Sequence, residues 1–312
     1  MQSKNSIPMT VRVVEVGPRD GLQNESVILS TQEKLRYINM LSETGLKDIE
    51  VSSFVNPARV PQLSDASEIF QQLERAEGIR YSALVPNMRG LERAQSVGVD
   101  AIAVFTAASE TFTQNNIGVS IEQSLTNFEE VVRVASANRI WVRGYVSTAF
   151  FCPFEGRMKT EQVTRVVERL LEMGVDEISV GDTIGHAVPT DVSTLTEVLL
   201  ATIPLKRFAY HFHDTRGTAL ANVLRALEYG ISIFDSASGG SGGCPFAPGA
   251  SGNLATEDLL YMLQCMGIET GVKIDKSVDG ALYLEALLGR YLPGKYMQAP
   301  DTISVNGSTD AL

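Results

Sequence analysis

Short apolar runs rich in β-branched residues alternate along the chain with segments in which apolar residues recur at helical spacing. The runs are typical of buried strands, and EQVTRVVERLLEMG at 161–174 is typical of the amphipathic helices that separate them. A further helix is expected near Thr31–Thr44. We predict strands at Val11–Val16, Lys47–Phe54, Arg80–Pro86, Ala101–Ala107, Trp141–Ser147, Glu177–Thr183, Phe208–Asp214 and Ser232–Ala237.

Strands and helices in strict alternation predict a parallel sheet with right-handed crossovers. Eight such units, repeated roughly every 30 residues, favour a closed (β/α)8 barrel. An open doubly wound sheet would favour a GxGxxG turn after the first strand, whereas GPRDGLQNE follows it at 17–25. The sequence therefore predicts an α/β chain folded as a single TIM-barrel domain over 1–312. Additional C-terminal helices are expected near Leu254–Met266 and Ser277–Gly289.

The charge balance narrows the range of partners. Lys and Arg number 26 against 37 Asp and Glu, which gives a net charge of −11 at pH 7 over 312 residues. Nucleic acid and anionic membranes both attract positive charge, so neither is expected as a partner. No stretch approaches the roughly 18–20 apolar residues that span a bilayer.

The N-terminal segment and the cysteines indicate the cellular compartment. The segment MQSKNSIPMT has neither an apolar signal core nor the Arg-rich pattern of a transit peptide. Cys152, Cys244 and Cys265 are odd in number and far apart, so any functional thiol is expected to be free. We expect a cytoplasmic protein with flexible termini at 1–9 and 300–312.

Unusual polar residues lie within or just after the predicted strands, where barrel enzymes place their catalytic groups. A solvated charge pattern would be scattered, whereas these positions converge on one mouth of the barrel. They are Arg19, Asp20 and Gln23 after the first strand, Glu50 in the second, Asp182 in the sixth, His211 and His213 in the seventh, and Cys244 and Asn253 after the eighth.

His211 and His213 are the most informative pair. Side chains at positions i and i+2 of a strand point to the same face, so both imidazoles can reach one point inside the barrel. Two hydrogen-bonded core residues are the alternative, but two of only 3 histidines placed this way favour a metal site. Asp20 could add a carboxylate oxygen and Asn253 an amide oxygen. This donor set fits Mg²⁺ or Mn²⁺ better than tetrahedral structural zinc.

Arg19 and Glu50 are predicted to act together. Next to a metal, the Arg19 guanidinium is placed to hold developing oxyanion charge, with a surface ion pair to Asp20 as the alternative. Buried glutamates are rare unless paired, and Arg19 is the obvious partner for Glu50. Glu50 would then orient Arg19, with proton transfer as its second option.

Cys244 lies in GGSGGCPFAPGASGN at 239–253, a loop of small and turn-forming residues that can close over a site. A thiol there suits general acid catalysis, with nucleophilic attack as the second choice. Cys265 is expected in the apolar core, and Cys152 is assigned to packing. His186 has no partner on the same face and is expected to support the site from outside at most.

Several of these segments carry a family resemblance, extending from about Val11 to Met297. They are GPRDGLQNE, IEVSSFV, GDTIG, HFHDTRG and GGCPFAPGASGN. Together they resemble the 3-hydroxy-3-methylglutaryl-CoA lyases, in the metal-dependent barrel superfamily of the isopropylmalate and homocitrate synthases. RDG-x-Q and His-x-His-Asp are shared across that superfamily, whereas GGCPFAPGASGN and the segment around Glu50 are more specific to the lyases.

The resemblance implies a carbon–carbon lyase that splits 3-hydroxy-3-methylglutaryl-CoA into acetyl-CoA and acetoacetate in leucine catabolism. It also implies Mg²⁺ or Mn²⁺ as cofactor, an acyl-CoA as substrate and a homodimer. By this match the metal ligands are Asp20, His211, His213 and Asn253, the catalytic residues are Arg19, Glu50, Cys244 and His211, and the substrate-binding residues are Arg19, Gln23 and Asp182.

The implied chemistry agrees with the residue types. A metal on the tertiary hydroxyl acidifies it, and loss of its proton lets the C–C bond break. Arg19 would stabilise the resulting acetyl-CoA enolate, and Cys244 would protonate it. The acceptor of the hydroxyl proton stays open between His211, His213 and Asp20.

Some positions depart from the family pattern. Phe212 stands where a small residue is usual but is expected to point away from the barrel interior. Arg216 replaces a tyrosine, and FFCPFEG and GDTIGHAVPT, which includes His186, differ from the common forms. These changes near the mouth make a longer C3-branched analogue the first alternative substrate. A synthase that condenses acetyl-CoA with a 2-oxo acid is the second alternative.

Overall fold

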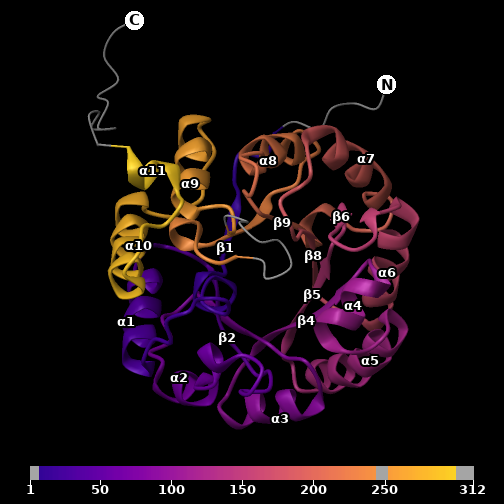
Figure 1. The fold of residues 1–312 in the computed structure, drawn as a ribbon, viewed down its shortest axis with the longest axis horizontal. Helices are drawn as coiled ribbons and strands as arrows, with labels where there is room; N and C mark the ends of the chain where they lie inside the picture. The colour runs from indigo at the N-terminus through magenta and orange to yellow at the C-terminus, as the bar shows by residue number, and fades with distance from the viewer. Residues whose placement is uncertain (1–6, 244–251, 300–312) are drawn as a thin grey trace, which may run out of the picture.

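The computed structural model of the protein describes residues 7–243 and 252–299. Eight parallel strands close into a barrel in which each strand pairs with the next barrel strand and the last returns to the first (Figure 1). The predicted (β/α)8 architecture is thus confirmed. The barrel strands are β1 (Arg12–Glu15), β2 (Asp48–Ser53), β3 (Arg80–Leu84), β4 (Ala101–Ala107), β5 (Trp141–Ser147), β8 (Glu177–Asp182), β9 (Phe208–Phe212) and β10 (Ile233–Ser236).

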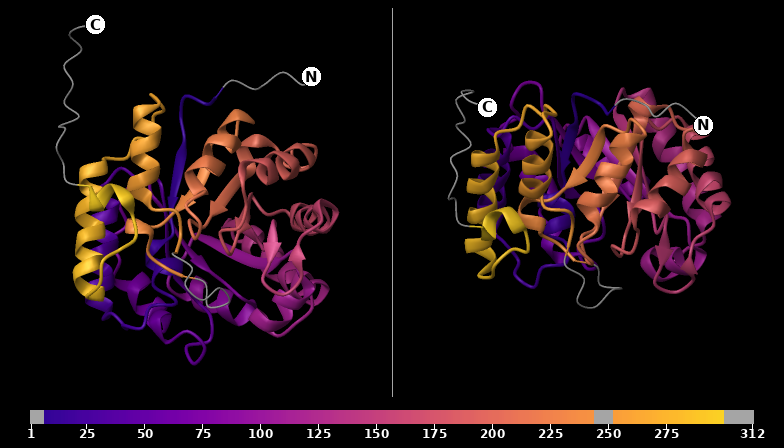
Figure 2. Two further views of the ribbon diagram at one scale, coloured as in Figure 1. Left: turned by 45° about the horizontal axis from the view of Figure 1, so that its top comes forward. Right: turned by 90° about the horizontal axis from the view of Figure 1, so that it is seen from above.

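Helices form a ring around the barrel (Figures 1 and 2). They are α1 (Thr31–Ser42), α2 (Ala66–Gln72), α3 (Met88–Ser96), α4 (Glu110–Ile117), α5 (Ile121–Ala137), α6 (Thr160–Met173), α7 (Pro189–Leu199), α8 (Ala219–Glu228), α9 (Thr256–Cys265), α10 (Ile274–Leu288) and α11 (Lys295–Gln298). After β10, α9 packs against α8 and α10 packs against α1, so the predicted C-terminal helices close the ring.

The boundaries of the helices follow from local sequence. At the start of α1, the Ser30 hydroxyl accepts the Glu33 N–H at 3.3 Å, and the Glu33 carboxylate accepts the Ser30 N–H at 2.8 Å. This reciprocal capping satisfies backbone donors that the first turn leaves unpaired. The end of α6 is set by Gly174, whose φ of 91° lies in the left-handed region that favours glycine.

Two elements that the sequence pattern did not predict lie in the loops after β4 and β5. They are α4 and an antiparallel hairpin formed by β6 (Phe151–Cys152) and β7 (Gly156–Arg157). Both follow the C-terminal ends of barrel strands, the end at which barrel enzymes build their sites. The pattern missed them because two-residue strands and a polar, eight-residue helix show no usable periodicity.

The main apolar core lies between the strands and the helices. Ile49, Val104 and Val180 face outward from the barrel and pack with helix residues such as Leu41 and Leu170, all fully buried. Burying a side chain of this size contributes about 1.5–3 kcal/mol. This outer layer therefore supplies most of the hydrophobic stabilisation of the fold.

The inside of the barrel combines small apolar clusters, such as Val14, Ala209 and Ile233, with paired charges. Arg12 Nη1 donates to Asp48 Oδ2 at 2.8 Å, and Arg12 also pairs with Glu177. Arg143 lies between two carboxylates, with Nε 3.0 Å from Glu177 Oε1 and Nη2 2.6 Å from Asp235 Oδ1. Buried charges require such partners, because taking an isolated ion out of water carries a large desolvation penalty.

Two expectations about side-chain placement are decided by the fold. Phe212 stacks on Tyr210 in the outer apolar layer, away from the barrel interior as expected. Cys265 is exposed, so its predicted core position is wrong. It follows the buried Leu263 by two positions, about 200° around the helix, which turns it toward solvent.

The N-terminal end of the described chain is attached to the fold, because Thr10 forms a β-bridge with Glu269. Most of the termini expected to be flexible, at 1–9 and 300–312, lie outside the described residues. Within 7–243 and 252–299, no helix has the length and apolar character needed to cross a membrane.

Replacing Arg143 by Met is expected to destabilise the barrel strongly, because Asp235 and Glu177 would each lose a buried partner. Breaking a buried pair from one side costs about 3–5 kcal/mol, which urea unfolding would measure. Arg133→Ala is the control, since Arg133 and Glu130 form only an exposed contact at 4.0 Å on α5. Its loss should stay below about 1 kcal/mol. Equal losses in the two variants would contradict the requirement that these interior carboxylates stay paired.

Candidate active site

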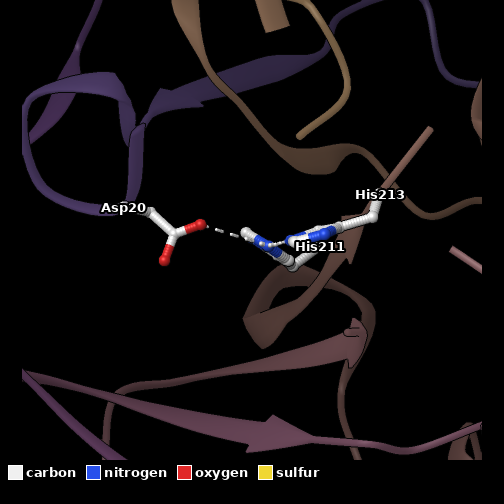
Figure 3. A group of neighbouring side chains, drawn as sticks. All are labelled: Asp20, His211 and His213. Carbon is white, nitrogen blue, oxygen red and sulfur yellow. Dashed lines mark hydrogen bonds and ion pairs between the residues drawn. The ribbon is translucent and has the colours of Figure 1, made fainter. Parts of the chain in front are cut away.

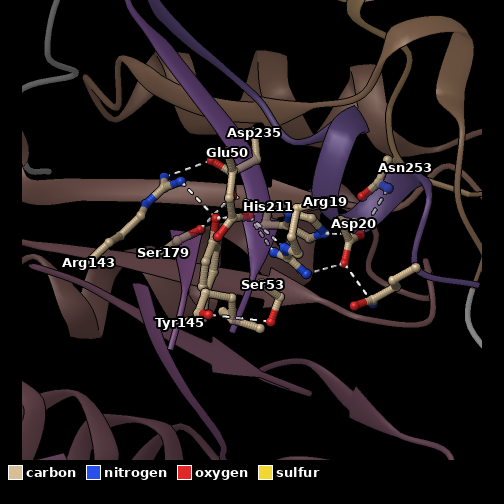
Figure 4. Close-up of polar contacts among 12 residues, drawn as sticks. Arg19, Asp20, Glu50, Ser53, Arg143, Tyr145, Ser179, His211, Asp235 and Asn253 are labelled. Carbon is tan, nitrogen blue, oxygen red and sulfur yellow. Dashed lines mark hydrogen bonds and ion pairs between the residues drawn. The ribbon is translucent and has the colours of Figure 1, made fainter. Parts of the chain in front are cut away.

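The residues after β1 form a π-helical turn, η1 (Gly17–Gly21), at the mouth of the barrel. The turn is closed by backbone N–H groups that bond back to the Val16 carbonyl, including that of Asp20 at 2.7 Å. A Cβ atom on Gly17 would lie 2.5 Å from the Tyr37 hydroxyl oxygen and 2.6 Å from Glu15 Oε1, so a larger residue would have to displace these buried side chains. The tight turn directs the side chains of Arg19 and Asp20 toward the barrel axis (Figure 4).

Asp20, His211 and His213 meet at this mouth (Figure 3). His211 lies in β9 and His213 follows it, and their Nε2 atoms are 3.1 Å apart, as the i, i+2 spacing predicts. Asp20 Oδ2 lies 4.0 Å from His211 Nε2. One potential ligand atom of each residue lies within 4.8 Å of the others, so the group can hold a metal ion.

Asn253 reaches the same group from the segment before α9, where it forms a β-bridge with His213. Its Nδ2 donates to Asp20 Oδ2 and to the Ser241 carbonyl, both at 3.0 Å. Its Oδ1 is buried and accepts no hydrogen bond within the described part of the chain. Burying an oxygen atom without a hydrogen-bond partner is unfavourable. Amide oxygens are also among the ligands that hard divalent cations bind. These residues therefore fit a metal ion.

The protonation states of the acid and of one imidazole suit metal binding, which needs free lone pairs. Burial would raise the pKa of Asp20, but the charge of Arg19 lowers it to about 2. Burial, assisted by His211, lowers the pKa of His213 to about 3. Asp20 is therefore ionised and His213 neutral at neutral pH.

Arg19 points into the mouth beside Asp20 and is held by Glu50, as predicted (Figure 4). Glu50 Oε2 accepts Arg19 Nε at 2.7 Å and lies 2.6 Å from Nη2, while Nη1 is 2.5 Å from Asp20 Oδ1. The Tyr145 hydroxyl donates to the same Glu50 oxygen at 3.2 Å. Burial raises the pKa of Glu50, and the charge of Arg19 opposes this shift. The guanidinium is thus fixed in orientation on two sides.

These side chains open into one cavity of about 1040 Å³. Its wall includes carboxamides from the loops after β2 and β3 and from α4, among them Asn56, Asn87 and Asn115. The volume is at the upper end of typical small-molecule sites, so it accommodates more than a short acyl group. The predicted site residues that line it are Arg19, Asp20, Gln23, His211 and His213.

Asp182 lies at the end of β8 but does not line the cavity. Its two carboxylate oxygens accept the backbone N–H groups of His186 and Ala187, both at 2.9 Å. Burial raises the pKa of Asp182 to about 6, although these two bonds oppose the shift. The carboxylate therefore shapes the loop after β8, and a contact between Asp182 and substrate stays a prediction.

The departures at Arg216 and His186 raised a longer C3-branched substrate as an alternative, and both side chains bond to or stack on neighbouring loops. Arg216 Nη1 donates to the carbonyls of Ile184 and Gly185 at 3.0 and 2.9 Å. The His186 ring stacks on Phe151, with the ring centroids 3.9 Å apart. Neither residue lines the cavity, because both are turned toward neighbouring loops.

Cys244 lies outside the described residues, so the structure does not place it. Three buried residues that the sequence analysis did not single out belong to the polar network of the site, namely Tyr145, Ser179 and Asp235 (Figure 4). A signal for two of them exists. Tyr145 follows Arg143 by two positions and Ser179 follows Glu177 by two, so polar side chains share one face of strands that are otherwise apolar.

Comparison with known proteins agrees with this geometry. A family model described as HMGL-like matches residues 10–281. Hydroxymethylglutaryl-CoA lyase of Bacillus subtilis is 49% identical over 93% of this chain and 97% of its own. The chain belongs to the HMGL-like family.

Solved structures agree as well. A crystal structure of the Bacillus subtilis HMG-CoA lyase has a TM-score of 0.93 at 48% identity, covering 94% of this chain and 99% of that one. An HMG-CoA lyase from Acinetobacter baumannii, in complex with coenzyme A and 3-methylmalate, has a TM-score of 0.92 at 38% identity. That match covers 97% of this chain and 99% of that one.

His213→Ala is expected to weaken Mn²⁺ binding, because it removes a ligand atom of the candidate metal site. Removing the hydrogen-bond partner of a metal ligand typically lowers metal affinity by about 10–100-fold. Removing the ligand itself should lower Mn²⁺ affinity by at least as much, which titration calorimetry would measure. His186→Ala is the matched control, since His186 stacks on Phe151 away from the cavity. Normal Mn²⁺ affinity in His213→Ala would exclude His213 as a ligand.

Proposed function

We propose that this chain cleaves 3-hydroxy-3-methylglutaryl-CoA to acetyl-CoA and acetoacetate with the help of a divalent metal ion. The observation that carries this proposal is the convergence of Arg19 with Asp20, His211 and His213 in one cavity of an HMGL-like chain. The reaction breaks the bond between C2 and C3. The 3-hydroxyl loses its proton and becomes a ketone, and C2 leaves as an enolate that must be protonated.

We propose Mg²⁺ or Mn²⁺ as the metal. Two imidazole nitrogens, one carboxylate and one amide oxygen form the donor set, from His211, His213, Asp20 and Asn253. The mixed nitrogen and oxygen donors, without a thiolate among them, fit these ions better than structural zinc. When bound, the ion would polarise the 3-hydroxyl and make its proton easier to remove.

Arg19 is proposed to stabilise the enolate oxygen of the departing acetyl-CoA. Its guanidinium is oriented by Glu50 before substrate arrives, so little reorganisation is needed as negative charge develops. Tyr145 holds Glu50 in turn through its hydroxyl. Glu50 thus acts through Arg19 as a positioning residue, which supports the orienting role over proton transfer.

Two proton transfers complete the reaction. The 3-hydroxyl proton goes to a neighbouring group in the cavity, and His211, His213 and Asp20 are the candidates there. We assign protonation of C2 to Cys244, on the basis of its loop sequence. Gln23 lines the cavity and donates to Asp20 at 3.0 Å, so it is proposed to bind substrate beside the metal.

The substrate is an acyl-CoA, and the cavity has the size and lining for more than its acyl end. Asn56, Asn87 and Asn115 offer carboxamides that can pair with the amides of a pantetheine arm. Arg216 and His186 do not line this cavity, so these two departures do not favour the longer C3-branched analogue. No contact in the described chain favours the condensing synthase.

We further propose that the enzyme acts in leucine catabolism as a cytoplasmic homodimer, with its single catalytic domain spanning 1–312. Free cysteines at Cys152 and Cys265 support a reducing compartment. The net charge of −11 supports the expectation that neither nucleic acid nor a membrane is a partner.

The function is tested by incubating the purified protein with 3-hydroxy-3-methylglutaryl-CoA and either Mg²⁺ or Mn²⁺. Acetyl-CoA and acetoacetate should form in equal amounts, stop forming with excess EDTA, and return when metal is restored. A protein that binds the metal but forms neither product would refute the proposed substrate. Full activity in EDTA would refute the metal requirement.

Cys244→Ala should lower kcat by about 10²–10⁴-fold, the usual contribution of a general acid, while metal affinity stays unchanged. Cys265→Ala is the matched control, because Cys265 is exposed on α9. Coupled kinetics and an Mn²⁺ titration of both variants measure the two effects separately. Wild-type kcat in Cys244→Ala would remove the thiol from the reaction.

A further inference from the structure

Asp235 lies in β10 directly opposite His211 of β9, with its carboxylate fully buried in the barrel. Three side chains converge on this carboxylate (Figure 4). Arg143 Nη2 donates to Oδ1 at 2.6 Å and Ser179 Oγ donates to Oδ2 at 2.9 Å. His211 Nδ1 lies 3.2 Å from the same Oδ2. The side of His211 that faces away from Asp20 is therefore in contact with a buried acid.

This contact selects one tautomer of His211. The close ion pair with Arg143 keeps Asp235 ionised, and an ionised carboxylate can only accept hydrogen bonds. His211 Nδ1 must then carry the proton, and Nε2 keeps its lone pair. Nε2 faces the candidate metal site, 3.1 Å from His213 Nε2 and 4.0 Å from Asp20 Oδ2.

The two histidines are not equivalent in this respect. Within the described chain, Nδ1 of His213 is buried and has no hydrogen-bond partner. His211 is held by Asp235 and also by Tyr145, whose ring meets the imidazole edge-on at a centroid distance of 6.3 Å and an angle of 83°. His211 is thus the histidine whose ring position and tautomer are both set by its neighbours.

We propose that Asp235 is a positioning residue that holds the Nδ1–H of His211 and so presents the Nε2 lone pair to the metal. This inference rests on the proposed metal-dependent function. Arg143 and Ser179 fix the carboxylate from the other side, so residues of the barrel interior determine the orientation of His211. Partners of this kind commonly tune metal-binding histidines.

Asp235→Asn tests the proposal with little change in shape. An amide has one accepting oxygen, which cannot serve Arg143 and His211 equally well as the two carboxylate oxygens do. If the oxygen pairs with Arg143, the NH₂ group faces His211 Nδ1 and donates a hydrogen bond to it. The proton of the imidazole then moves to Nε2, and a protonated Nε2 cannot bind metal. Titration calorimetry should show Mn²⁺ affinity lower by about 10–100-fold.

Glu177→Gln is the matched control. It makes the same change in a carboxylate that also pairs with Arg143, but its hydrogen bonds and ion pairs do not include His211. Both variants weaken the interior pairing, so urea unfolding should report a loss of stability for both. Only Asp235→Asn should lower Mn²⁺ affinity, while Glu177→Gln stays within about twofold of wild type.

A double-mutant cycle separates positioning from a general structural effect. In a His211→Ala background the Nδ1 contact no longer exists, so Asp235→Asn should not weaken Mn²⁺ binding further. Equal losses in Asp235→Asn and Glu177→Gln, or an undiminished Asp235→Asn effect without His211, would overturn the proposal. Wild-type affinity in Asp235→Asn would do the same. A wild-type protein that binds no Mn²⁺ would overturn the metal site itself.

Discussion

Charges buried inside the barrel have to be paired with one another, and this requirement shapes the molecule from one end of the barrel to the other. Barrels are commonly filled by apolar layers, whereas here Arg143 bridges Glu177 and Asp235 across the interior. The same principle operates at the mouth, where Arg19 is held by Glu50. Stability then comes mainly from the outer apolar layer, and the interior contributes fixed orientation. Groups oriented before substrate binds need little rearrangement as charge develops, which suits enolate chemistry.

A second constraint joins the first and the last strand–helix units of the barrel at the mouth. Glu15, at the end of β1, accepts the N–H groups of Gly17 and Ser238 at 2.8 and 2.9 Å and the Thr256 hydroxyl at 2.7 Å. Burial raises the pKa of Glu15 to about 7, although these bonds oppose the shift. One buried side chain thereby fixes η1 against the segment that precedes α9. This is why Asp20, from the first unit, lies within reach of residues that follow the last strand.

The sequence was informative where the structure depends on local periodicity and uninformative where it depends on pairing between distant strands. The alternation of apolar strands with amphipathic helices predicted the barrel. His211 and His213 lie side by side and Arg19 pairs with Glu50, as expected. Asp235 was missed because its partners lie on β5, β8 and β9, and strand register cannot be read from spacing. The helix α4 was missed because it is short and polar. The placement of Arg216 depends on how the chain turns after β9, which tertiary contacts decide.

Different parts of the fold position the side chains of the candidate site and line the cavity beside it. Arg19 and His211 take their orientation from Glu50 and Asp235, which lie in strands and are buried in the barrel. A loop residue such as Arg216 can therefore differ from the family pattern without moving Arg19 or His211, because its guanidinium bonds to the carbonyls of a neighbouring loop. Among interior positions, those bonded directly to these two side chains, such as Glu50 and Asp235, are the ones whose substitution is expected to disturb them. The cavity wall, to which the loops after β2 and β3 and the helix α4 contribute, is where selection among acyl groups and carriers is expected.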